Sequence, residues 1–378
     1  MFRLPLNQNF GVVLTELSVV NFKNYSEASI EVCSNINCFL GNNGQGKTNL
    51  LDAIYYLAFC KSYFNPIDSQ NINHDSEFFV VQGGFDREGK SEKIFCGLKK
   101  GQKKQFKRNK KEYSKLAEHI GLVPLVMVSP SDSELILGGS EVRRKFVDGV
   151  IAQFNPVYLD NLLNYQKSLT QRNALLKSFA ENRYFDEESL AIWDHKMQQY
   201  GFPVFEERKA FLDEFIPIFQ EYYQLLAPDY ESVGLKYVSK LEEGTLLELL
   251  AASRQKDGAL RYTSVGVHKD DLVFELGNHP MKRFGSQGQQ KSYLLALKLA
   301  QFEYIKRKKM TKPMILLDDV FDKLDNTRVE ALIKLVSDPE FGQIFITDTS
   351  KKRIEPILKK IGKEFKTFNV ERGKVVEL

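Results

Sequence analysis

The chain has 378 residues, of which 43% are hydrophobic, so it is long enough to build two lobes with cores of their own. Its formal net charge of +4 allows nucleic acid as a partner without requiring it. No run of about 18 apolar residues and no apolar leader occurs, which predicts neither a membrane span nor a secretory signal. We therefore expect a cytoplasmic protein with no membrane partner.

The cysteines agree with a reducing compartment. None of them forms a C-x-x-C pair, so their spacing predicts neither a zinc site nor a disulfide framework. We expect them to be free thiols in apolar segments. They are Cys33, Cys38, Cys60 and Cys96.

The first third of the chain is predicted to be rich in β-strands. Residues 12–39 contain three strand-like segments, VVLTELSVVNF, ASIEV and INCFL, separated by turn-forming residues. The segment TNLLDAIYYLAF follows with apolar residues at helical spacing, which predicts a helix. Residues 77–128 again predict strands, in EFFVVQGGF, KIFCGLKK and VPLVMVS.

The composition changes near Ser129 to a helical pattern. Residues 156–226 are almost entirely helical in pattern, and we expect Pro203 and Pro217 to break the helix. Strands return in SVGLKYVS and DDLVFEL, and a helix is expected from Gly288 to about Arg307. Two buried strands, PMILLDDVF and QIFITDTS, and a terminal hairpin complete the chain.

These elements predict an α/β fold class with two lobes. Residues 1–128 and 262–378 would form a head with a mixed sheet, and residues 129–261 a mainly helical second lobe. The helical region lacks the sustained heptads of a long coiled coil.

The segment GNNGQGKT lies between a predicted strand and a predicted helix and matches the phosphate-binding pattern G-x-x-x-x-G-K-[ST]. Its glycines allow a tight turn whose N–H groups face a phosphate, while Lys47 neutralises phosphate oxygens and Thr48 can bind Mg²⁺. A chance Gly/Asn turn rarely has both flanking elements. The predicted nucleotide-binding residues are Gly41, Asn42, Asn43, Gly44, Gln45, Gly46, Lys47 and Thr48, and Lys47 is also predicted to be catalytic.

Two acidic residues follow the buried strand MILL. Asp318 would leave the sheet beside the phosphates and hold Mg²⁺ together with Thr48, and Asp319 could orient the attacking water. The alternative is that both carboxylates only solvate a strand end, which is costly directly after four apolar residues. The sequence therefore predicts Asp318 as a metal residue and Asp319 as a catalytic one.

The segment FGSQGQQKS opens the late helix with polar residues. The hydroxyl of Ser286 and the free N–H groups of the helix start would make an anion site, and an ordinary polar N-cap is the alternative. A helix of about 20 residues spans roughly 30 Å. The strand that follows runs back toward the level of the helix start, but it covers only about 17 Å. The segment therefore cannot easily reach its own Asp318. We expect a two-fold dimer in which the nucleotide of the other copy is bound by Ser286, Gln287, Gly288 and Gln289.

Several segments, in this order, carry a family resemblance: NFKNY, GNNGQGKTNLLDAIYYL, VSPSDSELILGGSEVRRKFVD, YLDNLLNYQKSLTQRNALLK, GVHKDDLVF, FGSQGQQKS and ILLDDVFDKLD. Their order resembles the ATP-binding-cassette heads of the SMC superfamily, and together they closely resemble the RecF family of bacterial recombination and repair proteins. The similarity extends over nearly the whole chain. It implies an ABC/SMC-type P-loop ATPase head with a helical second lobe and no long coiled coil.

The resemblance also implies a function. Members of this family dimerise on ATP, hydrolyse it slowly and recognise gaps and junctions of single- and double-stranded DNA, and RecR and RecO are partners in loading recombinase during repair, replication restart and the SOS response. ATP and Mg²⁺ are the implied cofactors. Residues 323–325 would form a dimer-facing loop, and Lys23 would contact the nucleotide. Because the family usually has Arg at that position, Lys23 keeps the charge but not the bidentate grip.

Two assignments stay open. The glutamine of the cassette Q-loop is Gln70 or Gln82. The sensor of the γ-phosphate at the end of FITDTS is Asp348 or Thr349, unless this segment is only a strand-terminating turn.

Residues 99–115, KKGQKKQFKRNKKEYSK, are strongly basic with interleaved aromatic residues, which suits contact with a phosphate backbone. The alternative for this segment is a solvated charged face. The arginines of RRKFVD are also predicted to contact DNA, and their alternative is packing of the lobe or salt bridges between subunits. The predicted DNA contacts are Lys103, Lys104, Lys107, Arg108, Lys110, Arg143 and Arg144.

The leading hypothesis is an ATP-switched DNA clamp acting as a weak DNA-dependent ATPase. A cassette subunit that powers a membrane transporter, or another SMC-like NTPase, is the alternative, and the basic segment argues against the transporter. A monomeric P-loop kinase would leave GSQGQQ without a purpose.

Overall fold

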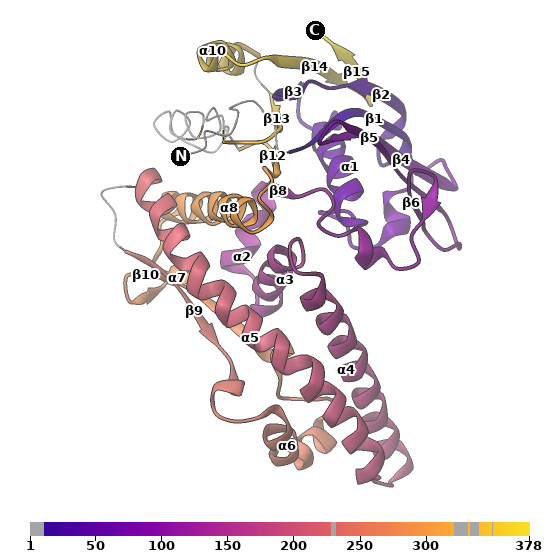
Figure 1. The fold of residues 1–378 in the computed structure, drawn as a ribbon, viewed down its shortest axis with the longest axis vertical. Coiled ribbons are helices and arrows are strands. Elements are labelled where there is room, and N and C mark those ends of the chain that lie inside the picture. Colours follow the sequence, from indigo (N-terminus) through magenta and orange to yellow (C-terminus); the bar gives the residue numbers. More distant parts are fainter. Residues whose placement is uncertain (1–10, 228–231, 321–331, 333–339, 350) are drawn as a thin grey trace, which may run out of the picture. The chain divides into compact units, whose positions relative to one another are not determined.

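The structure is a computed structural model that describes residues 11–227, 232–320, 332, 340–349 and 351–378. Its internal contacts divide the chain into two compact units, residues 1–132 with 298–378, and residues 133–297 (Figure 1). Residues 262–297, predicted within the head, group with the second unit. The reason is that β10 (Asp271–Leu276) pairs along its whole length with β9 (Val233–Val238).

The first unit contains a six-stranded sheet whose strands are parallel except for β15 (Lys374–Glu377), which pairs antiparallel with β14 (Phe365–Glu371). Its order is β15, β14, β3 (Ile36–Leu40), β13 (Ile344–Asp348), β12 (Met314–Leu317) and β8 (Leu125–Val128). Every residue of the four strands from β3 to β8 is buried, as expected for parallel strands covered on both faces. The predicted buried strands and terminal hairpin are thus confirmed.

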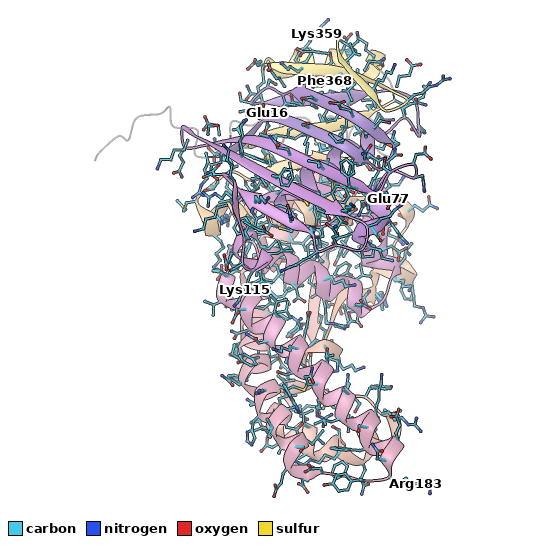
Figure 2. The ribbon with its side chains drawn as sticks, turned by 90° about the vertical axis from the view of Figure 1, so that its right-hand side faces the viewer. Glu16, Glu77, Lys115, Arg183, Lys359 and Phe368 are labelled. Atoms are coloured by element: carbon cyan, nitrogen blue, oxygen red, sulfur yellow. The ribbon has the colours of Figure 1, made fainter. Side chains whose placement is uncertain are left out.

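A second, antiparallel sheet of the same unit has the order β2 (Tyr25–Glu31), β1 (Val12–Phe22), β4 (Phe78–Arg87), β5 (Lys90–Lys99), β6 (Gln105–Arg108) and β7 (Lys111–Glu112). Alternate residues of β1 and β5 are buried, which is the pattern that predicted strands here. Figure 2 looks onto this sheet, with Glu16 on β1 and Glu77 just before β4. Helix α1 (Lys47–Phe59) shares one apolar core with residues of both sheets.

The second unit is built around a helical hairpin of α4 (Pro156–Asn182) and α5 (Glu187–Leu226), which lie side by side (Figure 1). The side chains of Asn155 and Asp186 cap their N-termini, and Arg183, labelled in Figure 2, ends α4 in a left-handed conformation. The other helices and the short strand are α2 (Glu134–Leu137), α3 (Ser140–Ile151), α6 (Leu246–Leu260), α7 (Met281–Phe284) and β11 (His279–Pro280).

Two further helices complete the described elements. Helix α8 (Gln287–Lys309) begins in the second unit and continues into the first, and α10 (Lys351–Ile361) follows β13. Short 3-10 turns lie at η1 (Asp68–Asn71), η2 (Leu116–His119), η3 (Pro130–Ser133), η4 (Lys240–Glu242) and η5 (Val267–Lys269).

The prediction that two prolines break the helical region is wrong, because α5 continues through both Pro203 and Pro217. Both prolines lie on the exposed side of the helix. The carbonyls that lose their partners belong to Gln199 and Asp213, which are exposed too, so water can satisfy them. The apolar side of the hairpin stays intact.

The cysteines are free and buried, as predicted. Burial raises the pKa of the Cys60 thiol to about 12. Among the described helices, none is long and apolar enough to cross a bilayer.

Candidate nucleotide-binding site

The loop between β3 and α1 needs glycine at specific positions. Gly44 and Gly46 have φ angles of 77° and 114°, in the left-handed region that favours glycine. A Cβ atom at Gly46 would lie 2.5 Å from the side-chain amide of Asn24, and one at Gly41 would lie 2.2 Å from the carbonyl oxygen of Val370. The strand–loop–helix setting of the predicted P-loop is therefore confirmed, and close neighbours hold it on two sides.

The side chain of Lys47 is buried and lies along the loop. Its Nζ donates to the carbonyl oxygens of Gly41, at 2.8 Å, and Asn42, at 3.1 Å. The ammonium group thus stays inside the curve of the loop, where a phosphate would lie.

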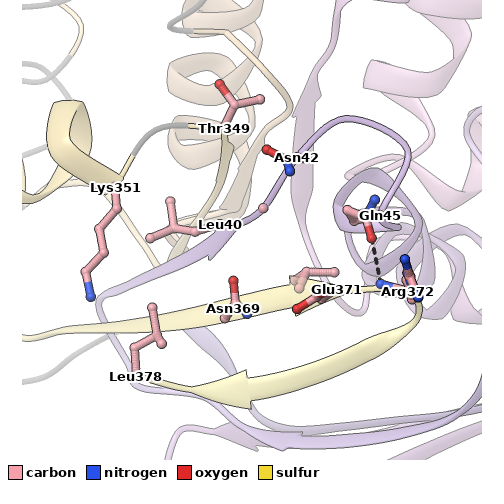
Figure 3. Close-up of a pocket in the computed structure, with 11 residues that line it drawn as sticks. Leu40, Asn42, Gln45, Thr349, Lys351, Asn369, Glu371, Arg372 and Leu378 are labelled. Carbon is pink, nitrogen blue, oxygen red and sulfur yellow. Dashed lines mark hydrogen bonds between the residues drawn. The ribbon is translucent and has the colours of Figure 1, made fainter.

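The C-terminal hairpin contacts the outer side of the loop (Figure 3). The N–H of Arg372 donates to Oε1 of Gln45 at 2.7 Å, and the N–H of Gly373 donates to the carbonyl oxygen of Gln45 at 3.3 Å. A pocket of about 460 Å³ lies here, lined by Asn42, Thr349 and residues of the hairpin.

The predicted metal residues lie together where the parallel strands end. The Thr48 hydroxyl donates to Oδ1 of Asp318 at 2.8 Å. Thr347 donates to the same oxygen at 2.9 Å and accepts from the N–H of Asp319 at 2.8 Å. Burial raises the pKa of the Asp318 carboxyl. This set of hydroxyl and carboxylate oxygens suits Mg²⁺, which prefers hard oxygen ligands.

Thr347 lies in FITDTS, the segment predicted to carry the γ-phosphate sensor, but its contact with Asp318 was not predicted. It lies on β13 between β3 and β12, so its hydroxyl falls between Thr48 and the two acids. The sequence could have indicated this contact, because FITDTS and MILLDD both end in polar residues and the carboxyl ends of parallel strands meet at one edge of the sheet. Asp348 is buried and its carbonyl accepts from the N–H of Gly41, while Thr349 lines the pocket, so the choice of γ-phosphate sensor stays open.

Lys23 is already paired within the first unit. Its Nζ lies 2.6 Å from Oδ2 of Asp52, a fully buried carboxylate on α1, one turn after Thr48. Its contact with a nucleotide stays a prediction.

The start of α8 has a polar N-cap, which was the alternative to an anion site for this segment. The N–H of Ser286 donates to Oε1 of Gln289 at 2.8 Å, and the N–H of Gln289 donates to the Ser286 hydroxyl at 3.2 Å, a reciprocal capping box. Binding of a partner's nucleotide by residues 286–289 stays a prediction. Residues 323–325 lie outside the described residues, and the Q-loop stays open, with Gln70 in η1 and Gln82 on β4.

The basic segment forms the end of β5, a turn and the hairpin β6–β7. Two of its predicted DNA contacts have partners within the unit. Lys104 lies 2.6 Å from Asp68 and donates to the carbonyl oxygen of Cys60, and Arg108 forms a two-bond pair with Glu92. Lys103 and Lys110 are exposed, and Lys107 lies over the Phe95 ring at 5.6 Å.

The two predicted arginines of the second unit also have internal partners. Arg143 makes two bonds to Asp271, at 2.8 and 2.9 Å, and Arg144 donates to the carbonyl oxygen of Asp270 at 2.6 Å. These contacts agree with the packing alternative for RRKFVD.

The P-loop, the Thr48–Asp318 pair and the parallel strand order define a P-loop NTPase head of the cassette type. The family model described as "RecF/RecN/SMC N terminal domain" matches residues 13–373. A protein of Phocaeicola vulgatus, "DNA replication and repair protein RecF", is 55% identical over 97% of this chain and 98% of its own. The equally named protein of Flavobacterium johnsoniae is 53% identical over 94% and 99%.

The solved structures agree. One described as "Structure of the recombination mediator protein RecF-ATP in RecFOR pathway" aligns with a TM-score of 0.90 and 29% identity, over 99% of this chain and 100% of its own. An Smc head domain from Pyrococcus furiosus, with a TM-score of 0.55 and 16% identity over 97% and 96%, shares the fold. The chain belongs to the RecF family of DNA replication and repair proteins. The comparisons support this function and not a transporter subunit.

Proposed function

We propose that the chain is an ATP-dependent DNA-binding protein of recombinational repair and replication restart. ATP binding would close a two-fold dimer on gapped or junction DNA, and slow hydrolysis would release it. The observation that carries this proposal is the convergence of Thr48, Asp318 and Thr347 beside the P-loop. RecR, with RecO in the pathway, is the proposed partner in loading recombinase, in the cytoplasm.

The nucleotide half of the proposal assigns roles to residues of the first unit. Lys47 and the N–H groups of the loop would bind the phosphates, and Thr48 and Asp318 would hold Mg²⁺. The described residues contain no cluster of three or more His, Cys, Asp or Glu that could hold a metal unaided, which fits an ion bound mainly through nucleotide phosphates. Asp319 would orient the attacking water, and its short side chain agrees with a weak ATPase.

The dimer half assigns the start of α8 to the nucleotide of the second copy. The capping box leaves the helix start with its dipole and an exposed Ser286. We expect Ser286→Arg to bind ATP as the wild type does but to dimerise at least tenfold more weakly, because the long side chain obstructs the partner's γ-phosphate. Sedimentation with and without ATP measures this, and Ser286→Thr is the control. Equal dimer fractions in Ser286→Arg and wild type would contradict the trans site.

The DNA half rests on the lysines without an ion-pair partner among the described residues. Lys103 and Lys110 are exposed at the β6–β7 hairpin, and Lys107 projects from β6. Together they can contact a phosphate backbone.

The decisive experiment measures binding to gapped and to fully duplex DNA with and without ATP, in the presence and absence of RecR. We expect tighter binding to gapped DNA with ATP, and no effect of ATP in a Lys47→Met variant. Identical binding to both DNAs under all conditions would refute the clamp.

A further inference from the structure

The chain leaves the first unit after Asp132 and returns to it at Lys298. These two residues are bound to each other. Their side chains are 4% and 5% exposed, and Nζ of Lys298 lies 2.7 Å from Oδ1 of Asp132. Nζ also donates to the carbonyl oxygen of Met127 at 2.9 Å, and Oδ2 of Asp132 accepts from the N–H of Ser129 at 2.8 Å. A buried ion pair therefore ties together both points at which the chain crosses between the units.

A third side chain, Tyr63, joins this pair. Its hydroxyl donates to Asp132 and lies 3.3 Å from Nζ of Lys298. Burial and the neighbouring carboxylate raise the pKa of the Tyr63 hydroxyl, so it stays a hydrogen-bond donor. We call Tyr63, Asp132 and Lys298 the crossing cluster.

The crossing cluster is connected to the P-loop helix. The N–H of Tyr63 donates to Oδ1 of Asp52 at 2.7 Å, and the neighbouring Ser62 hydroxyl donates to Oδ2 at 2.6 Å. Asp52 is fully buried on α1, four residues after Thr48 and therefore on the same side of the helix. Tyr63 thus links the helix that carries Thr48 to both crossing points, through its backbone N–H at one end and its hydroxyl at the other.

Lys298 also belongs to α8, and Ser286 caps the start of this helix. An uninterrupted helix is stiff, so a small rotation at Lys298 becomes a larger displacement at its start. The ion pair itself resists partial opening, because separating buried partners leaves uncompensated charge.

We propose that Tyr63, Asp132 and Lys298 are positioning residues that set the orientation of the Ser286 segment according to the state of the P-loop. None of them would touch the nucleotide. The inference rests on the proposed ATP-dependent dimer, because the Ser286 segment acts on the partner's nucleotide. It predicts that damage to the cluster separates ATP binding from dimerisation.

The test is Tyr63→Phe, which removes one hydroxyl and keeps the ring. Tyr55→Phe is the matched control, because Tyr55 is a tyrosine of α1 whose ring packs edge-on against Tyr63 at 4.9 Å. ATP affinity is measured by titration and the dimer dissociation constant by sedimentation with saturating ATP. We expect Tyr63→Phe to keep ATP affinity within twofold and to raise the dimer dissociation constant at least fivefold. In Tyr55→Phe both should stay within twofold.

A double variant, Asp132→Asn with Lys298→Met, removes both charges together and repeats the test independently of Tyr63. It should also keep ATP affinity within twofold and raise the dimer dissociation constant at least fivefold. Unchanged dimerisation in both variants overturns the inference, and so does an equal loss of ATP affinity and dimerisation, which indicates a structural role alone. If the wild-type protein stays monomeric with ATP, the proposed dimer fails and this inference fails with it. If the wild type dimerises but the variants do not show the split between ATP affinity and dimerisation, only this inference fails.

Discussion

The charge clusters around Arg172 and around Asp318, one in each unit, are buried in different ways. In the second unit, Arg172 is fully buried between Asp194, at 2.6 Å, and Asp257, at 2.7 Å, and Arg208 is bound by Asp148 and Asp270. In the first unit, Asp318 is buried beside the hydroxyls of Thr48 and Thr347, and its pKa is raised. Charges that neutralise one another maintain a fold, whereas a carboxylate held by hydroxyls keeps its capacity to bind a cation.

The largest effect should come from breaking a buried charge cluster. Arg172→Met leaves Asp194 and Asp257 buried without their cation, and we expect it to lower the free energy of unfolding by about 3–5 kcal/mol. Urea denaturation measures the loss. Lys145→Met removes a cation of the same unit from an exposed pair with Glu141, and should change stability by less than about 0.5 kcal/mol. Similar losses in both variants would contradict the comparison.

Lys47→Met tests a buried charge that is proposed to bind a ligand and not to maintain the fold. Removing the ammonium from the P-loop should lower ATP affinity at least 100-fold, about 3 kcal/mol. Isothermal titration gives the affinity. The control is Lys351→Met, because Lys351 lines the neighbouring pocket but is half exposed and paired with Glu355. An equal loss of affinity in the control would show that general positive charge, and not the P-loop lysine, binds the phosphates.

Each unit also contains a buried histidine whose ring nitrogens contact a tyrosine hydroxyl and a carbonyl oxygen, so the two units can be compared at a matching group. His268 in the second unit accepts from the Tyr165 hydroxyl and donates to the carbonyl oxygen of Thr263, and His119 in the first unit has a tyrosine and a carbonyl as partners too. Burial lowers the pKa of each to about 4.

Because these pKa values lie below the unfolded value of about 6.5, each histidine contributes stability that is complete above that pH and is lost as pH falls toward 4. We expect about 2 kcal/mol of loss per histidine between pH 7.5 and 5. Denaturation of wild type, His268→Gln and His119→Gln at both pH values measures it. A pH dependence that is unchanged in both variants would assign the loss to other groups.

The smallest expected effect concerns DNA. Reversing Lys103, Lys107 and Lys110 to Glu should lower the magnitude of the slope of log affinity against log salt by about 2–3. Reversing Lys145, Lys167 and Lys196 of the second unit changes the net charge equally and should leave the slope nearly constant. Fluorescence anisotropy at several salt concentrations gives both slopes. If the second set lowers the slope more, the DNA surface lies on the helical unit.

Sequence patterns predicted the elements and the phosphate loop well, because local periodicity and turn chemistry determine them. They failed where tertiary neighbours decide. The contact of Thr347 with Asp318 became visible only when β13 was found between β3 and β12. No local pattern indicated that Lys104 pairs with Asp68, or that Arg143 pairs with Asp271 on a distant strand, and their contact with DNA stays a prediction. The exposure of Pro203 and Pro217 likewise depends on which side of α5 packs.

The place of β3 in its sheet has a consequence for biosynthesis. This strand leads into the P-loop, yet its two neighbours, β13 and β14, are formed by residues 344–348 and 365–371. A ribosome therefore releases the nucleotide motif long before the strands that flank it exist, and pairing must await the synthesis of residues 344–371. A nascent chain stalled before β13 should be unable to bind ATP, and a tag fused directly after Leu378 would sit beside the hairpin that braces Gln45.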